Sequence, residues 1–108
     1  MKIIADTHLH FYSCYDAGVA ITGLDSNLAR LAPEAVKTGF LTERKDSHFF
    51  RDLANGVVKP EGLVVDESGE GECLVLSRKD KRPLYLFDGK QFVSAERVEV
   101  LGLACNIA

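Results

Sequence analysis

Apolar residues form a short, unbroken run at the start of the chain. Residues 2–6 read Lys-Ile-Ile-Ala-Asp, without the alternation of apolar and polar side chains that marks a half-exposed strand. A run of this kind is typical of a strand buried on both faces, as in a parallel sheet. Residues 11–22 mix aromatic and small side chains without a period. We therefore expect a strand at 2–6 and a loop over 11–22.

Apolar residues at helical spacing occupy the next part of the chain. They recur between residues 24 and 36, and Asp25 or Ser26 can cap the start of a helix by accepting a hydrogen bond from a first-turn N–H. Pro33 falls inside this stretch and Gly39 follows it. Because proline interrupts a helix and glycine often ends one, the pattern predicts two short helical pieces that end at Gly39.

A second helix is predicted after residue 47. Asp46 and Ser47 are suitable N-terminal caps, and Asn55-Gly56 is a stop signal. The apolar face between them consists of Phe49, Phe50, Leu53 and Ala54. We expect this face to pack into the core.

Strand-like runs dominate the last third of the chain. Residues 73–77 and 84–87 are apolar and are joined by a charged connection of hairpin length. Residues 98–104 are the most hydrophobic segment and predict another buried strand, whereas the acidic, glycine-rich residues 66–72 predict a solvent-exposed loop. With a short strand at 40–43, these elements predict an α/β fold with a mainly parallel sheet and a hairpin in its second half.

Composition excludes several classes of protein. The chain has 108 residues, 46% of them hydrophobic, with 13 Lys and Arg against 16 Asp and Glu. That length suits one domain, and a net charge of -3 gives no electrostatic attraction to nucleic acid or to an anionic membrane. No apolar run reaches the roughly 20 residues of a membrane span, and the first residues do not form a signal peptide. Cys14, Cys73 and Cys105 form no C-x-x-C pair, so we expect buried thiols and a reducing cytoplasm.

The chemistry of the sequence is concentrated in the segment Asp6-Thr7-His8-Leu9-His10. Side chains alternate along a strand, so Asp6, His8 and His10 are predicted to share one face. Two imidazoles at this spacing can bind one metal ion, and a nearby carboxylate can complete or orient the set. The ends of strands are also where open α/β sheets place their sites. The alternative is a pair of half-exposed histidines, with Asp6 as a turn cap.

Two later residues are candidates for the same site. Glu43 closes the predicted strand at 40–43, and in a parallel sheet its carboxylate would lie at the same edge as the two histidines. Arg44, followed by Lys45 and Arg51, supplies positive charge that could bind an anionic substrate, the alternative being solvated surface charges. His48 is expected to be an exposed residue in the first turn of its helix.

These motifs resemble those of the PHP family, the polymerase and histidinol phosphatase metallohydrolases. Residues 6–10, directly after the N-terminal strand, are similar to the first motif of that family and, more distantly, to TatD and amidohydrolase enzymes. Residues 40–44 are similar to the second motif. Residues 89–93, followed by 98–103, are similar to the third. The three partial matches follow in family order across most of the chain.

The resemblance implies a seven-stranded α/β barrel that holds Mn, Fe or Zn ions and hydrolyses a phosphate ester with a metal-bound hydroxide. His8 and His10 would then ligate one metal, with Asp6 beside them and Glu43 in the acidic position of the second motif. The sequence departs from the family at two places. Arg44 stands where the family has a ligating His, and Gln91 stands where it has a carboxylate that bridges two metals.

Two functions follow from these observations. The first is a metal-dependent phosphoesterase that acts on a small phosphorylated substrate through metal-activated water, with no catalytic residue assigned beyond the metal ligands. The alternative is a non-catalytic PHP-like module that acts in partner binding or assembly, as the departures at Arg44 and Gln91 suggest. Because an α/β barrel needs roughly 200 residues, we expect residues 1–108 to be either a single domain or the N-terminal part of a larger one, completed by a C-terminal half or by another copy in a homo-oligomer.

Overall fold

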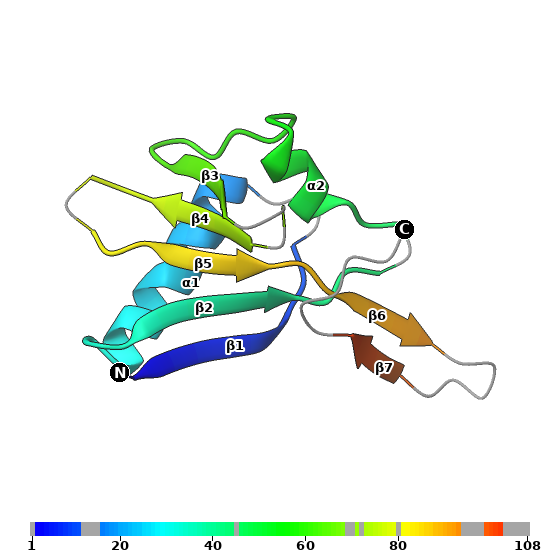
Figure 1. Ribbon diagram of the computed structural model, residues 1–108, viewed down its shortest axis with the longest axis horizontal. Helices are drawn as coiled ribbons and strands as arrows, with labels where there is room; N and C mark the ends of the chain where they lie inside the picture. Colours follow the sequence, from blue (N-terminus) through cyan, green and yellow to red (C-terminus); the bar gives the residue numbers. More distant parts are fainter. Residues whose placement is uncertain are drawn as a thin grey trace.

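A five-stranded sheet forms the centre of the molecule, with a separate hairpin beside it (Figure 1). The computed structural model describes residues 2–11, 16–44, 46–68, 71, 73–79, 81–93 and 99–102. The elements in chain order are β1 (Ile3–Leu9), α1 (Ala17–Leu31), β2 (Val36–Leu41), α2 (Phe49–Ala54), β3 (Val64–Ser68), β4 (Cys73–Ser77), β5 (Leu84–Phe87), β6 (Lys90–Val93) and β7 (Glu99–Gly102).

The sheet is mixed rather than mainly parallel. Its strand order is β1-β2-β5-β4-β3, and β2 pairs in parallel with both β1 and β5. β4 is antiparallel to β5 and β3, and β6 and β7 form an antiparallel pair of their own. The prediction of an α/β fold with hairpins in the second half is confirmed, but that of a mainly parallel sheet is wrong. Strands joined by short turns can pair only in antiparallel fashion, whereas the parallel pairs need crossovers such as α1.

The first helix begins and ends earlier than the sequence pattern predicts. Residues from Ala17 onward are helical instead of a loop, and the predicted second helical piece is the strand β2. Asp16 caps α1, since its side chain accepts a hydrogen bond from the backbone N–H of Val19 at 3.0 Å. Gly39 lies inside β2 rather than at a helix end. A Cβ there would lie 2.8 Å from a methyl carbon of Leu9, so any larger residue would require the Leu9 side chain to shift within the core.

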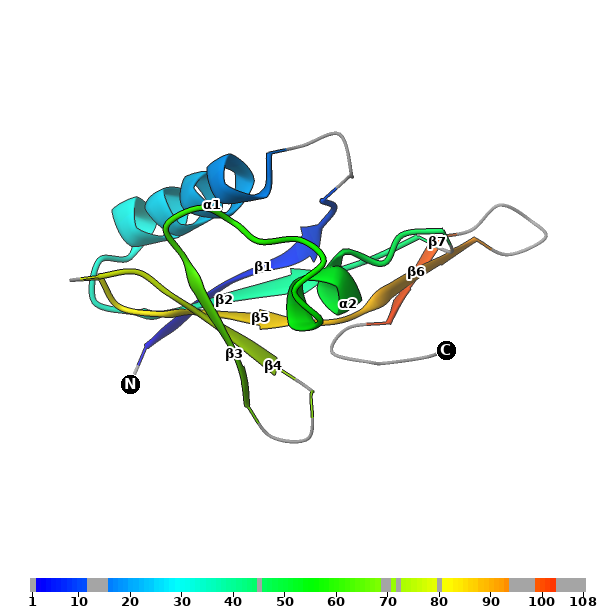
Figure 2. The same cartoon turned by 90° about the horizontal axis from the view of Figure 1, so that it is seen from above.

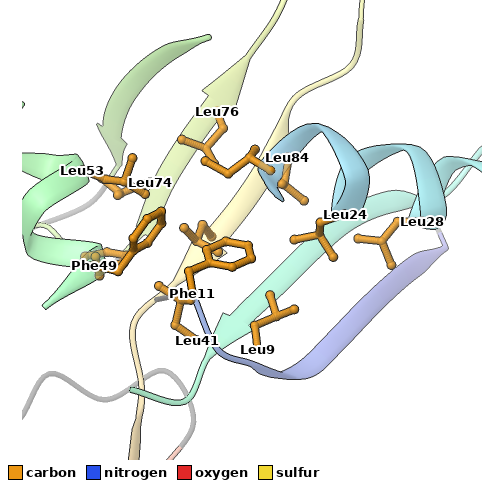
Figure 3. Packing of buried hydrophobic residues seen from close by; sticks show 13 residues of the cluster. Leu9, Phe11, Leu24, Leu28, Leu41, Phe49, Leu53, Leu74, Leu76 and Leu84 are labelled. Atoms are coloured by element: carbon orange, nitrogen blue, oxygen red, sulfur yellow. The ribbon is translucent and has the colours of Figure 1, made fainter. Parts of the chain in front are cut away.

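α1 lies along one face of the sheet (Figure 2), and the buried side chains of α2 belong to the same hydrophobic core. Their apolar side chains meet those of the strands in one core, and Figure 3 shows this packing from close by. The prediction of α2 is confirmed: Phe49, Phe50 and Leu53 are buried, and the helix ends at Asn55. Its N-terminal cap is His48, which makes no side-chain capping bond, rather than Asp46 or Ser47.

Four other expectations have outcomes in the structure. β1 is an edge strand, so the prediction of burial on both faces is wrong, and Ile3 is 62% exposed. Residues 66–68 belong to β3 instead of a loop. Cys73 is a buried, free thiol as expected, whereas Cys14 and Cys105 lie outside the described residues. β7 confirms a strand within 98–104, of which 98, 103 and 104 lie outside the described part. No helix in the described ranges is long and apolar enough to cross a membrane.

Candidate functional site

A β-bulge at the carboxyl end of β1 decides how the candidate metal ligands are presented. Asp6 pairs with Gly39 and Leu9 with Leu41, so three steps along β1 correspond to two steps along β2. Gly39 and Leu9 both face the core beneath α1. Asp6 therefore lies on the helix side of the sheet, whereas His8 and His10, which flank Leu9, lie on the opposite side. The expectation that all three share one face is wrong, because the extra residue breaks the alternation.

The two imidazoles are in direct contact. His8 Nε2 lies 3.0 Å from His10 Nε2, at hydrogen-bond distance, and the ring centroids are 4.9 Å apart in an edge-on arrangement. His8 is exposed and His10 is half-buried. The two ring nitrogens therefore converge at a point that solvent can reach.

Asp6 is held by the bulge rather than by the imidazoles. A bulge leaves one residue of the strand without a partner in the ladder. Asp6 Oδ1 accepts a hydrogen bond from the backbone N–H of His8 at 3.1 Å, so the carboxylate satisfies a donor within the bulge. This contact positions the backbone that carries both histidines, which corresponds to the turn-capping alternative for Asp6.

Glu43 follows the carboxyl end of the neighbouring strand, as expected, but it turns toward α2. It is 3% exposed, and its Oε1 accepts a hydrogen bond from the backbone N–H of Phe50 at 2.8 Å. Its Oε2 accepts one from Lys90 Nζ at 3.2 Å. Both carboxylate oxygens thus have donors on the helix side of the sheet. Glu43 therefore links the end of β2 to α2 and to β6 through these two hydrogen bonds.

Asp88 lies beside Glu43, and the sequence analysis did not predict it as a site residue. It is 7% exposed, and Oδ1 accepts a hydrogen bond from the backbone N–H of Gly89 at 2.9 Å. Burial, reinforced by the negative charge of Glu43, raises the pKa of Asp88 to about 6. The sequence offered only the turn signal Asp88-Gly89, which explains the backbone contact but not the neighbouring carboxylate. A pocket of about 120 Å³ opens beside these groups, and His48, Arg51 and Lys90 also line it.

Arg44 and Gln91 occupy different surroundings from each other. Arg44 is exposed in the segment between β2 and α2. Gln91 is 7% exposed, its backbone N–H donates to the carbonyl oxygen of Glu43 at 2.8 Å, and its Oε1 is buried without a hydrogen-bond partner. His48 is exposed, as expected. Of the predicted site residues, the structure places His8 and His10 in contact. Asp6 accepts a hydrogen bond from the backbone N–H of His8, and Glu43 lies near α2 with Asp88 and Lys90.

The donor set around the histidine pair is small. Within the ranges that the structure describes, no group of three or more His, Cys, Asp or Glu side chains is arranged to hold a metal ion. The imidazole pair can supply two nitrogen ligands, and the remaining positions of an ion would be open to water or substrate. No protein-family model, curated protein or solved structure matches this chain.

Proposed function

We propose that this chain is a metal-binding domain of the PHP phosphoesterase type, in which His8 and His10 bind one divalent Mn, Zn or Fe ion. The observation that carries the proposal is the 3.0 Å separation of the two Nε2 atoms. Two nitrogen ligands at about 2.05 Å from one ion lie about 2.9 Å apart at a right angle and about 3.3 Å apart at the tetrahedral angle. The pair is therefore close to the spacing that a single ion requires.

The residues around the pair have distinct parts in this proposal. Asp6 orients the bulge that carries the imidazoles. Neutral imidazoles donate ring lone pairs, and the two-ligand arrangement leaves positions for a phosphate ester. A divalent ion supplies Lewis acidity toward phosphoryl oxygens and toward water. Arg44, exposed after β2, supplies positive charge for the phosphate group of a small substrate.

Metal binding is the direct test. We expect purified protein, stripped of metal and titrated with Zn²⁺ or Mn²⁺ by calorimetry, to bind about one ion per chain. His8→Ala and His10→Ala should each abolish this binding. His48→Ala is the matched control, since it removes an exposed imidazole outside the pair and should leave binding unchanged. Equal binding by all four proteins would refute the proposal.

The non-catalytic alternative is supported by two observations of its own. Both oxygens of Glu43 are engaged by Phe50 and Lys90, and Gln91 has a neutral amide where a bridging ligand would need charge. Turnover of an aryl phosphate ester with added Mn²⁺ separates the two functions. Loss of turnover in His10→Ala but not in His48→Ala supports the phosphoesterase. Metal binding without turnover by any of these proteins supports a binding module.

The open edge of the sheet supports the larger assembly that the PHP resemblance implies. Among the described residues, β1 pairs on one side only, with β2. We propose further that the open edge of β1 pairs with a strand of a further segment or of another copy, because closure of a barrel requires such pairing. Analytical ultracentrifugation tests pairing with another copy: a dimer supports it, and a monomer refutes it.

A further inference from the structure

A cluster of charged side chains lies between α1 and the sheet, at the amino ends of β2 and β5. Lys37, the second residue of β2, donates a hydrogen bond to Asp25 Oδ1 of α1 and forms an ion pair with it. Arg78, directly after β4, places Nη2 3.6 Å from Asp25 Oδ2. This edge is opposite to the one that carries His8 and His10, and it includes the β4–β5 connection at the left of Figure 1.

The charges in this cluster do not balance. One carboxylate, that of Asp25, is shared by two cations, and no other acidic side chain in the described ranges pairs with either of them. The side chain of Lys37 is 7% exposed and that of Arg78 is 29% exposed. The single negative charge of Asp25 can neutralise only one of these two cations, so one positive charge remains in excess in this cluster. The site therefore favours an anion from outside the chain.

A small hollow opens at the same place. Asp25, Arg78, Lys81 and Arg82 line it together with apolar side chains, and its volume is about 10 Å³. That is room for roughly one water-sized group. Lys81 and Arg82 are exposed at its rim. Arg82 Nη1 donates a hydrogen bond to the carbonyl oxygen of Glu34 at 3.2 Å, which fixes its guanidinium beside the hollow while other N–H groups remain available.

We propose that the cationic rim of this hollow binds a phosphate-class oxyanion, with its oxygens against Arg78, Lys81 and Arg82. The available groups at the rim are N–H donors, because the Asp25 carboxylate is already engaged on both oxygens. A guanidinium matches an oxyanion with two parallel hydrogen bonds, and a lysine ammonium adds a point charge. The site is independent of the proposed metal function, since it includes neither imidazole.

Calorimetric titration with inorganic phosphate at pH 7 and low ionic strength tests this site. We expect saturable binding of one phosphate per chain, weakened about tenfold or more in a Lys81→Ala/Arg82→Ala variant. Lys2→Ala/Lys59→Ala is the matched control. It removes the same charge from exposed positions elsewhere, so its affinity should stay within about twofold of the starting protein. Because all four side chains are exposed, thermal unfolding should verify that both variants keep their fold.

Two further arms complete the test. Titration with adenosine monophosphate tests whether the site prefers a phosphomonoester to free phosphate. The ligand that binds with the higher affinity identifies the preferred form. A His8→Ala/His10→Ala variant should retain phosphate binding even if the metal proposal fails. The inference is overturned if the starting protein shows no saturable binding, if both double variants lose affinity equally, or if binding disappears with the histidines.

Discussion

Replacement of Asp88 by Asn should stabilise the fold at neutral pH. The ionised carboxylate is buried beside Glu43, and its pKa is raised from 3.8 to about 6 by burial and by that second negative charge. The folded state therefore binds more protons than the unfolded state between about pH 4 and pH 6. Stability falls as pH rises through that window, and the loss is complete above about pH 6. Asparagine keeps an oxygen to accept from the backbone N–H of Gly89 and cannot ionise.

The magnitude follows from the size of the shift. Each pKa unit is worth about 1.4 kcal/mol, so a rise from 3.8 to about 6 corresponds to about 3 kcal/mol at full effect. The pocket of about 120 Å³ beside Asp88 admits water, which screens the interaction. We therefore expect Asp88→Asn to be about 1–2 kcal/mol more stable than the starting protein at pH 7, with this advantage gone at pH 4.

Urea unfolding at pH 4, 5, 6 and 7 measures this difference directly. Asp66→Asn, an exposed position on β3, is the control and should change stability equally at every pH. The quantity that matters is the difference between Asp88→Asn and the starting protein, because the contributions of all other titrating groups cancel in it. A difference that stays constant from pH 4 to pH 7 would refute the reasoning.

Four other substitutions probe the fold, each measured by urea unfolding. Gly39→Ala should cost about 1–3 kcal/mol, because its Cβ would lie 2.8 Å from a core methyl, whereas Gly23→Ala on α1 meets nothing within 4 Å and should stabilise by about 0.5–1 kcal/mol. Asp16→Ala removes the cap of α1 and should cost about 1 kcal/mol, so no change would contradict that capping role. Glu43→Gln weakens the ion pair with the half-buried Lys90 while Asp88 remains beside Lys90, and should cost about 1 kcal/mol, so a neutral effect would show that the pair is dispensable.

The sequence predicts best where local signals agree. The apolar face of α2 and the Asn55-Gly56 stop signal both predict a helix that ends at residue 55, and α2 is present. β4 and β5 are likewise strong apolar runs joined by a short charged turn. Their antiparallel pairing follows from that turn. The short connection between these two strands is also evidence against a mainly parallel sheet.

The failures have physical causes that a single sequence does not display. α1 contains Gly18 and Gly23, which weaken its helical pattern, and its cap is Asp16 rather than a residue nearer the leucines. The bulge in β1 depends on its register with β2, so alternation counted along one strand cannot place Asp6. The contact between Glu43 and Asp88 joins segments that only the folded chain brings together.

The place of β2 in the sheet has a consequence for the order in which the chain folds. β3, β4 and β5 are neighbours in sequence as well as in space, so their pairing closes only short loops. β2 instead pairs with β5 across a long stretch of the chain that contains α2, β3 and β4. Because loop-closure entropy grows with the intervening length, we expect the β3–β4–β5 meander to form before the β2–β5 pairing, and the latter to slow folding.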